Sequence, residues 1–254
     1  MECEIEIADV KNFKKCVDSI LNLVREGNFE IDENGISLRA MDPSQISMVI
    51  FSIGKESFAN YSVKTGGKIG VDLEYLSKIL NRWKNNERVI MRILNKKFEI
   101  IFLGEKSKKN FYIPAIDVPS GPIRELKIDY IAKIKMRGKE INDILQDSAI
   151  IGPHVKFFVD KGLLRIESHG ENSNLIAELE ESENVKIETS SPTSAIFSQE
   201  YLYSITKECD DKEEIEINIS GPTENDPRPK PLCARYEIGN ASFIYYLAPR
   251  IETE

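Results

Sequence analysis

The sequence lacks long hydrophobic runs and is poor in cysteine and histidine. No stretch approaches the roughly 18 apolar residues that a membrane-spanning helix needs. The N-terminus alternates charged and apolar residues, unlike a signal peptide. The histidines are His154 and His169, and the widely separated cysteines are Cys3, Cys16, Cys209 and Cys233. No two cysteines have a Cys-x-x-Cys spacing, so we expect neither a zinc site nor a disulfide framework, but reduced and mostly buried thiols.

Recognisable catalytic signatures are also missing. The chain has no GxSxG, no phosphate-binding P-loop and no HExxH motif. We expect His154 to begin a strand and His169 to end the next one. Acidic pairs such as Glu180-Glu181 are expected in solvated turns. The sequence therefore predicts no catalytic residue, no metal site and no cofactor, and an unrecognised enzyme is kept only as an alternative.

The chain has no excess of positive charge. Its 34 lysines and arginines are outnumbered by 42 aspartates and glutamates, giving a net charge of −8. That balance argues against a typical basic nucleic-acid-binding domain, although lysines can still gather on one surface. With 254 residues, of which 41% are hydrophobic, the chain is long enough for one large domain or two ordinary ones.

An internal duplication is the most informative positive feature. The tripeptide Glu-Tyr-Leu at 74–76 recurs at 200–202. Three further segments recur in the same order at an offset of 126 or 127 residues: 12–21 at 139–148, 29–40 within 154–168, and 87–94 at 213–220. Four matches at one offset predict two similar domains.

Each half has the pattern of an α+β domain. We expect the order strand, helix, three strands, second helix and three more strands, which accounts for seven of the roughly nine strands expected per half. Apolar residues spaced for one helix face are Phe13, Val17, Ile20 and Val24 in the first helix, and Leu73, Leu76, Leu80 and Trp83 in the second. Strands such as 133–136 and 165–167 alternate apolar and polar residues, which predicts antiparallel sheets with one wet face.

A segment rich in proline and glycine lies between the halves, at 116–129. It cannot continue a sheet ladder, so we read it as a linker. The predicted division is a first domain at 1–117, a connecting linker at 118–129 and a second domain at 130–254. The polar loop 221–231 is expected to be exposed and mobile.

Three motifs resemble the proliferating cell nuclear antigen family of DNA sliding clamps, archaeal type. They are Arg39-Ala40-Met41-Asp42-Pro43-Ser44-Gln45-Ile46-Ser47-Met48, then Gly70-Val71-Asp72-Leu73 followed by Leu76-Ser77-Lys78-Ile79-Leu80, and the tail Tyr245-Tyr246-Leu247-Ala248-Pro249-Arg250-Ile251-Glu252. The resemblance covers essentially the whole chain. It implies the DNA-clamp fold, with two helices packed on antiparallel sheets in each domain, and a closed trimeric ring.

The resemblance also implies how such a ring closes. The edge strands 108–116 and 174–180 would pair between neighbouring subunits, which removes exposed sheet edges. The interface residues expected on these edges are Phe111, Tyr112, Ile113, Leu175, Ile176 and Ala177. Ordinary internal strands are the alternative interpretation of both segments.

The helices of family members line the hole and face duplex DNA. The matching basic residues here are Lys11, Lys14, Lys15, Lys78, Arg82, Lys84, Lys139 and Lys207. We expect weak, salt-dependent phosphate attraction without base readout, on the assumption that acidic residues lie mainly on other elements. The third helix departs from this pattern because it carries Asp143 and Asp147 against one lysine.

Family members also dock short peptides of DNA polymerase, flap nuclease, DNA ligase and the clamp loader. By resemblance the pocket comprises Met41, Gln45, Ile46, Met48, Leu126, Ile128, Pro231, Tyr246, Ala248 and Pro249, and core positions are the alternative interpretation of its methionines and Ile46. Methionine and aliphatic groups suit varied partners. Departures from relatives are Gln45, the basic residues Arg124 and Lys127 in the linker, and the long 221–231 loop.

The resemblance implies a processivity factor in DNA replication and repair. A homotrimer is the expected assembly and the first one to test. A subunit specialised for a heterotrimeric clamp, or a scaffold without DNA in its hole, stays open because one chain does not reveal whether an interface is self-complementary. The expected location is the cytoplasm, with the nucleoid, in an archaeon, or the nucleus in a eukaryote.

Overall fold

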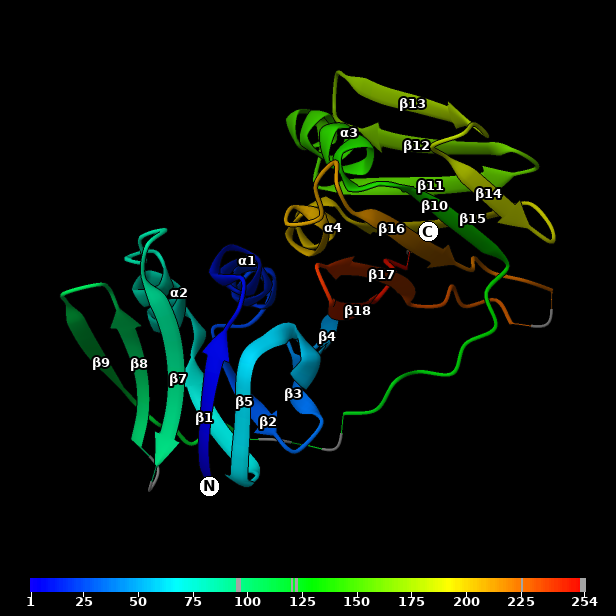
Figure 1. Cartoon of the computed structure of the whole chain (residues 1–254). Coiled ribbons are helices and arrows are strands. Elements are labelled where there is room, and N and C mark those ends of the chain that lie inside the picture. The colour runs from blue at the N-terminus through cyan, green and yellow to red at the C-terminus, as the bar shows by residue number, and fades with distance from the viewer. Residues whose placement is uncertain (95–96, 120, 122, 225, 252–254) are drawn as a thin grey trace. The chain divides into compact units, whose positions relative to one another are not determined.

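The computed structural model describes residues 1–94, 97–119, 121, 123–224 and 226–251 (Figure 1). Its contacts divide the chain into two compact units. The first contains Met1–Pro43, Val49–Arg124 and Ile238–Ser242, and the second contains Ser44–Met48, Glu125–Glu237 and the chain from Phe243 onward. Each half of the duplicated sequence therefore forms most of one unit. It also contributes one short segment to the other unit: Ser44–Met48 belongs to the second, and Ile238–Ser242 to the first.

Among its described residues, the N-terminal half contains two α-helices, a short 3-10 helix and nine strands. The helices are α1 (Val10–Leu21), α2 (Leu73–Leu80) and η1 (Lys55–Ser57). The strands are β1 (Glu2–Ile7), β2 (Glu26–Ile31), β3 (Gly35–Met41), β4 (Ser47–Gly54), β5 (Phe58–Thr65), β6 (Gly67–Asp72), β7 (Arg88–Leu94), β8 (Lys97–Leu103) and β9 (Lys108–Pro114).

The C-terminal half has the same numbers of α-helices and strands, and its described residues form no 3-10 helix. Its α-helices are α3 (Gly138–Ile151) and α4 (Gln199–Thr206). Its strands are β10 (Ala132–Arg137), β11 (His154–Asp160), β12 (Leu163–His169), β13 (Asn174–Glu180), β14 (Lys186–Thr189), β15 (Thr193–Ser198), β16 (Glu214–Ile219), β17 (Leu232–Ile238) and β18 (Ala241–Leu247).

The strand order is the same in both halves. The first half has the orders β5-β1-β7-β8-β9 and β6-β2-β3-β4, and the second has β14-β10-β16-β17-β18 and β15-β11-β12-β13. Counted from the start of each half, the strands match one to one. The predicted duplication and the α+β class are therefore confirmed. The prediction of three strands between the helices is wrong, because five strands lie between α1 and α2.

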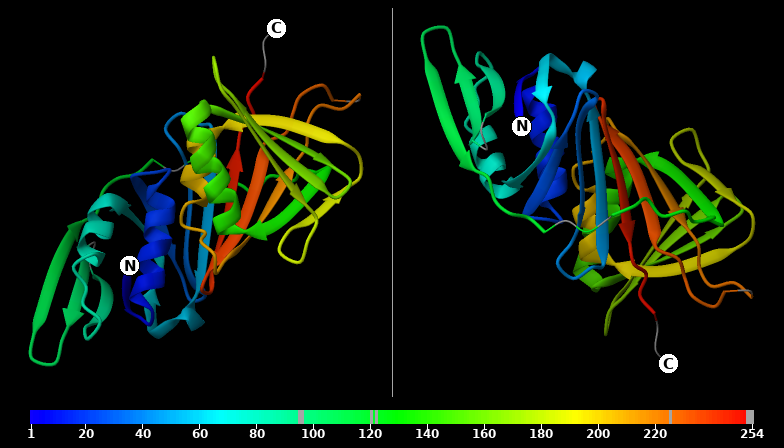
Figure 2. Two further views of the ribbon diagram at one scale, coloured as in Figure 1. Left: turned by 90° about the horizontal axis from the view of Figure 1, so that it is seen from above. Right: turned by 90° about the horizontal axis from the view of Figure 1, so that it is seen from below.

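The two α-helices of the N-terminal half begin where side chains cap their free N–H groups. Asp9 accepts from the backbone N–H of Asn12 (3.0 Å) before α1, and Asp72 accepts from that of Tyr75 (2.8 Å) before α2. The predicted apolar faces are buried, since Val17 and Leu76 are at most 1% exposed. Figure 2 shows each helix pair from two further directions, with α1 beside α2 and α3 beside α4.

Between β9 and β10 the described residues form no helix or strand, apart from a single bridge between Ile116 and Gly70. The first part of this connection is fastened to the first unit, where Asn28 donates to the carbonyl of Val118 (2.9 Å). The second part, from Glu125, belongs to the second unit. In the part of the chain that the structure covers, no helix is long and apolar enough to cross a membrane.

Candidate functional site

Basic side chains gather on the helix pair of the first unit. Lys11 and Lys78 are exposed on α1 and α2, whereas Lys14 and Lys15 are half-buried along α1. Arg82 and Lys84 are exposed just past the end of α2. The four lysines within the helices lie away from the buried apolar stripes, as the helical spacing of the sequence predicts.

Acidic residues are less separated from these lysines than the sequence interpretation assumed. Asp18 forms an ion pair with Lys14 one turn away and accepts a hydrogen bond from the Ser77 hydroxyl of α2 (2.5 Å). Glu74 forms an ion pair with Lys78 on α2, and its hydrogen bond with that lysine lowers the carboxyl pKa. That assumption is corrected: two of the predicted DNA-contacting lysines already have an acidic partner on the same helix.

The helix pair of the second unit differs. Lys139 and Lys207 are exposed, but so are Asp143 and Asp147 on α3. The acidic character that the sequence indicates for the third helix is therefore present on its solvent face. A single lysine on α3 stands against three acidic residues on the same helix.

The segment Ser44–Met48 lies against the end of β18 within the second unit. The backbone N–H of Ala248 donates to the Ile46 carbonyl (2.9 Å), and the Ser47 hydroxyl donates to the Tyr246 carbonyl (3.0 Å). Gln45 has a φ of 58°, the left-handed conformation that turns the chain into β4. Four of the predicted pocket residues, Gln45, Ile46, Tyr246 and Ala248, are thus brought together.

The predicted pocket residues differ in exposure. Ile46 is 38% exposed and Leu126 is 41% exposed, so both offer apolar surface. Met48 is only 5% exposed, which makes it a core residue of the chain. Met41, 43% exposed, belongs to the first unit and is described with that unit alone. The remaining predicted pocket residues, Ile128, Pro231 and Pro249, are half-buried in the second unit.

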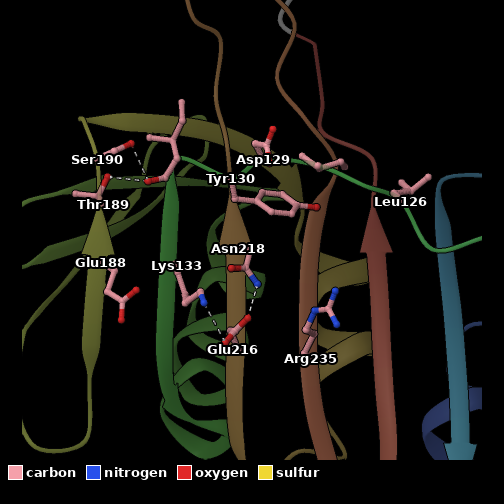
Figure 3. Close-up of a pocket in the computed structure, with 12 residues that line it drawn as sticks. Leu126, Asp129, Tyr130, Lys133, Glu188, Thr189, Ser190, Glu216, Asn218 and Arg235 are labelled. Atoms are coloured by element: carbon pink, nitrogen blue, oxygen red, sulfur yellow. Dashed lines mark hydrogen bonds and ion pairs between the residues drawn. The ribbon is translucent and has the colours of Figure 1, made fainter.

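A hollow of about 640 Å³ lies beneath the second part of the linker (Figure 3). Leu126 and Ile128 line it, as predicted for the docking pocket, but most of its lining was not anticipated. The unexpected residues are Asp129, Tyr130, Ile131, Lys133, Glu188, Thr189, Ser190, Glu216, Asn218 and Arg235.

Four of these residues form a row of alternating charge across neighbouring strands. Figure 3 shows Glu188 of β14, Lys133 of β10, Glu216 of β16 and Arg235 of β17 side by side. Lys133 is directly opposite Glu188, and Glu216 is directly opposite Arg235. Period-two alternation marks all of them as outward-facing. The sequence therefore predicts that these four side chains face outward, but it does not reveal the strand order that places them next to one another.

Polar contacts bind the linker to the second unit. Arg235 donates to the Glu125 carboxylate (2.6 Å), and the hydroxyl of Tyr246 donates to the Leu126 carbonyl (3.2 Å). The hydroxyl of Tyr130 donates to the carbonyl of Pro231 (3.0 Å). Burial raises the pKa of Tyr246 to about 12, and it also raises the pKa of Tyr130. Both hydroxyls therefore stay protonated donors at neutral pH.

The two predicted interface edges each end a sheet. β9 is the last strand of β5-β1-β7-β8-β9, and β13 is the last of β15-β11-β12-β13. Tyr112 on β9 and Ile176 on β13 are large apolar residues with 60% and 59% of their surface exposed. Phe111, Leu175 and Ala177 are half-buried. Ile113 is only 3% exposed and already packs inside its own unit.

Among the residues that the structure describes, no group of three or more His, Cys, Asp or Glu side chains could hold a metal ion. All four cysteines are buried, as predicted, and none of them is in a disulfide bond.

Comparison with known proteins decides the family. The family model for the proliferating cell nuclear antigen N-terminal domain matches residues 1–117, and the model for its C-terminal domain matches residues 124–251. The chain belongs to the proliferating cell nuclear antigen family. Members are sliding clamps, and this chain is accordingly a non-enzymatic processivity factor, as the sequence motifs predicted.

Relatives within the proliferating cell nuclear antigen family match over nearly the whole length. The DNA polymerase sliding clamp of Methanococcus vannielii is 30% identical over 96% of this chain and 97% of its own. That of Thermococcus onnurineus is 27% identical over 99% and 100%. The crystal structures of the antigens from Entamoeba histolytica and Thermococcus kodakaraensis, each 20% identical, superpose with a TM-score of 0.88. They cover 98% of this chain and 99% and 100% of their own, which confirms the fold.

Proposed function

We propose that three copies of this chain close into a ring around duplex DNA and that the ring tethers replication and repair proteins through a peptide-docking pocket. Family membership supports the general role. The ring is supported by one observation above all, namely the repeated strand order that leaves β9 and β13 as matching free edges.

The chain contains a template for the contact between subunits. β18 is the counterpart of β9, and β4 is the counterpart of β13, because each pair occupies the same place in its half. Within the second unit, the residue after β18 pairs with the residue before β4, since Ala248 donates to Ile46. An end-to-start contact of this kind is antiparallel. The same contact between chains would join the end of β9 to the start of β13.

The template also gives a register. Carrying the Ala248–Ile46 pair to the counterpart strands puts Ala115 opposite Ser173. Tyr112 then lies opposite Ile176, the two most exposed apolar residues of these edges. At the other end, Lys108 lies opposite Glu180. Apolar and opposite-charge pairs directly across two strands both favour pairing, so exposure and charge support the same register.

The contact is head to tail, and such contacts stay finite only when the rotation closes. We expect a species of about 87 kDa, three times 28.9 kDa, by light scattering after size exclusion across a dilution series. Lys108→Glu should weaken the trimer, and adding Glu180→Lys should restore it. A monomer at every concentration would contradict the homotrimer and point to a subunit that needs unlike partners.

We propose that the helices carry the DNA contacts through Lys11, Lys14, Lys15, Lys78, Arg82, Lys84, Lys139 and Lys207. Attraction would be to phosphates only, because flexible lysines on amphipathic helices offer charge without base-edge readout. Binding of this kind is salt-dependent and compatible with sliding. The chain would act in the compartment that holds the DNA.

We also propose that peptides from DNA polymerase, flap nuclease, DNA ligase and the clamp loader dock beside the linker. The exposed side chains of Ile46 and Leu126 supply apolar contacts for aromatic and aliphatic plugs. Met48 is left out of the proposed contact surface because it is buried.

A further inference from the structure

The second part of the linker, from Glu125, and the residue that follows the linker, Tyr130, have no secondary structure of their own to hold them. Three side-chain bonds fasten them to the second unit: Arg235 to Glu125, Tyr246 to the Leu126 carbonyl and Tyr130 to Pro231. Between these fastenings lie Leu126 and Ile128, the two linker residues of the proposed docking pocket. Where the linker lies therefore decides where these apolar side chains are presented.

The Arg235–Glu125 pair is the shortest of the three bonds and the only ionic one. Burial lowers the pKa of the guanidinium, but its bonds to Glu125 and to the Cys233 thiol outweigh that effect and raise it overall. Cys233 is 1% exposed, and burial raises the pKa of its thiol. The guanidinium of Arg235 therefore contacts a thiol that is neutral at physiological pH, and it forms its ion pair with Glu125 of the linker.

A second carboxylate competes for Arg235. Glu216 is its direct neighbour on β16. In the structure Glu216 instead accepts from the amide of Asn218 (2.9 Å) and faces Lys135 (3.5 Å) and Lys133 (3.8 Å). Because the two lysines and the amide already pair with the Glu216 carboxylate, Arg235 forms its ion pair with Glu125. The alternating row of charges ends at Arg235 (Figure 3), which donates to Glu125 of the linker.

We propose that Arg235 and Glu125 form a clasp that positions the linker for peptide docking, with Glu216 as the alternative acceptor when the clasp opens. This inference rests on the proposed docking function. Arg235 does not itself need to touch the peptide; it acts as a positioning residue. A clasp on an irregular segment increases the fraction of molecules whose linker is in the binding-competent conformation. The apparent affinity for the peptide scales with that fraction.

The clasp should contribute little to global stability, because both side chains are partly exposed, at 41% and 48%. Loss of the pair should therefore appear in linker mobility and peptide affinity, and not in unfolding. This separates a positioning role from a merely structural one.

Linker mobility can be measured directly. Lys127 is exposed in the middle of the linker, whereas all four native cysteines are buried. A nitroxide label on Lys127→Cys would therefore report on the linker alone by electron paramagnetic resonance. Arg235→Ala and Glu125→Gln should each increase the mobility of the label, and the swap of Arg235→Glu with Glu125→Arg should return it toward the original value.

Peptide affinity is the second readout. The probe is a fluorescent synthetic peptide that presents leucine and phenylalanine side chains on one helical turn. We expect Arg235→Ala and Glu125→Gln to weaken its binding about five-fold, with recovery to within about two-fold in the charge swap. Arg92→Ala is the matched control, because its pair with Glu4 (2.7 Å) has similar exposure, 36% and 43%, on a sheet of the first unit. It should leave both readouts unchanged.

The two measurements test the Arg235–Glu125 clasp separately from the peptide-docking proposal on which it rests. Unchanged label mobility in both single variants overturns the clasp, as does a charge swap that recovers neither mobility nor affinity. If the unmodified chain fails to bind the peptide, the docking proposal fails, while the mobility of the label still tests the clasp. Glu125→Gln keeps the test available if Arg235→Ala does not fold, since Glu125 is on the surface.

Discussion

The two helix pairs occupy equivalent places in the duplicated fold but carry opposite charge. Within their bounds, α1 and α2 contain four basic and two acidic residues, whereas α3 and α4 contain one basic and four acidic residues. The buried positions have kept one pattern in both halves, because packing fixes them. The solvent-facing positions have not. The comparison suggests that DNA would be held mainly by the first pair.

The largest effect is expected from removing charge on the first pair. The triple variant Lys11→Ala, Arg82→Ala and Lys84→Ala should reduce affinity for duplex DNA at least about ten-fold at low salt, and should lower the slope of log affinity against log salt by about 2 to 3. Fluorescence anisotropy titrations at several salt concentrations measure both. The exposed turn residues Lys106, Lys161 and Lys212, changed together to alanine, are the matched control. Equal losses in the two variants would remove the distinction between helices and turns.

A gain of affinity is expected from the second pair. Asp143→Asn with Asp147→Asn removes two exposed negative charges from α3, and should strengthen DNA binding about three-fold. The same titration applies, with Glu181→Gln and Glu183→Gln as the surface control. No gain, or a gain equal to the control, would mean that the second pair does not face DNA.

A mixed effect is expected at Asp18, which connects α1 and α2. Asp18→Asn frees Lys14 from its ion pair and weakens the bond from Ser77. DNA affinity should rise about two-fold because one lysine is released. Stability should fall by about 1 kcal/mol, because a hydrogen bond to a charged acceptor becomes one to a neutral acceptor. Urea unfolding measures the loss, and unchanged values for both quantities would contradict the role given to Asp18.

The smallest effect concerns Glu74 and pH. Its pKa is lowered by the hydrogen bond with Lys78, so the ion pair is fully present above the ordinary carboxyl pKa and is lost only as pH falls through the lowered one. Glu74 therefore offsets Lys78 throughout the neutral range. Glu74→Gln should raise DNA affinity less than about two-fold, by the same increment near pH 6 and pH 8. An increment that varied between these pH values would show that another group controls Lys78.

Much of the fold could be predicted because it depends on periodicity and repetition. Phe13, Val17 and Ile20 recur at helical spacing, and they are buried. Of the five strands between α1 and α2, β5 is hard to predict, since it is mostly exposed at the edge of its sheet and lacks a clear apolar alternation. The predicted helix stripes also extended too far, because Val24 and Trp83 lie past the helix ends.

The site was less predictable, because it depends on pairs of residues distant in sequence. Ile46 and Leu126 could be named from motifs, but Met48 is buried even though it shares its side of β4 with the half-buried Ile50 and the exposed Ser52. The Arg235–Glu125 pair joins residues 110 positions apart. Strand order brings them together, and no local pattern contains that information.

The reactivity of the buried cysteines can report on local unfolding of each unit. Cys3 and Cys16 lie in the first unit, and Cys209 and Cys233 lie in the second. A thiol reagent reacts only with thiols that it can reach, so native protein should be almost inert. Modification of one cysteine pair before the other would then reveal which unit opens first, and at what free energy, without any engineered probe.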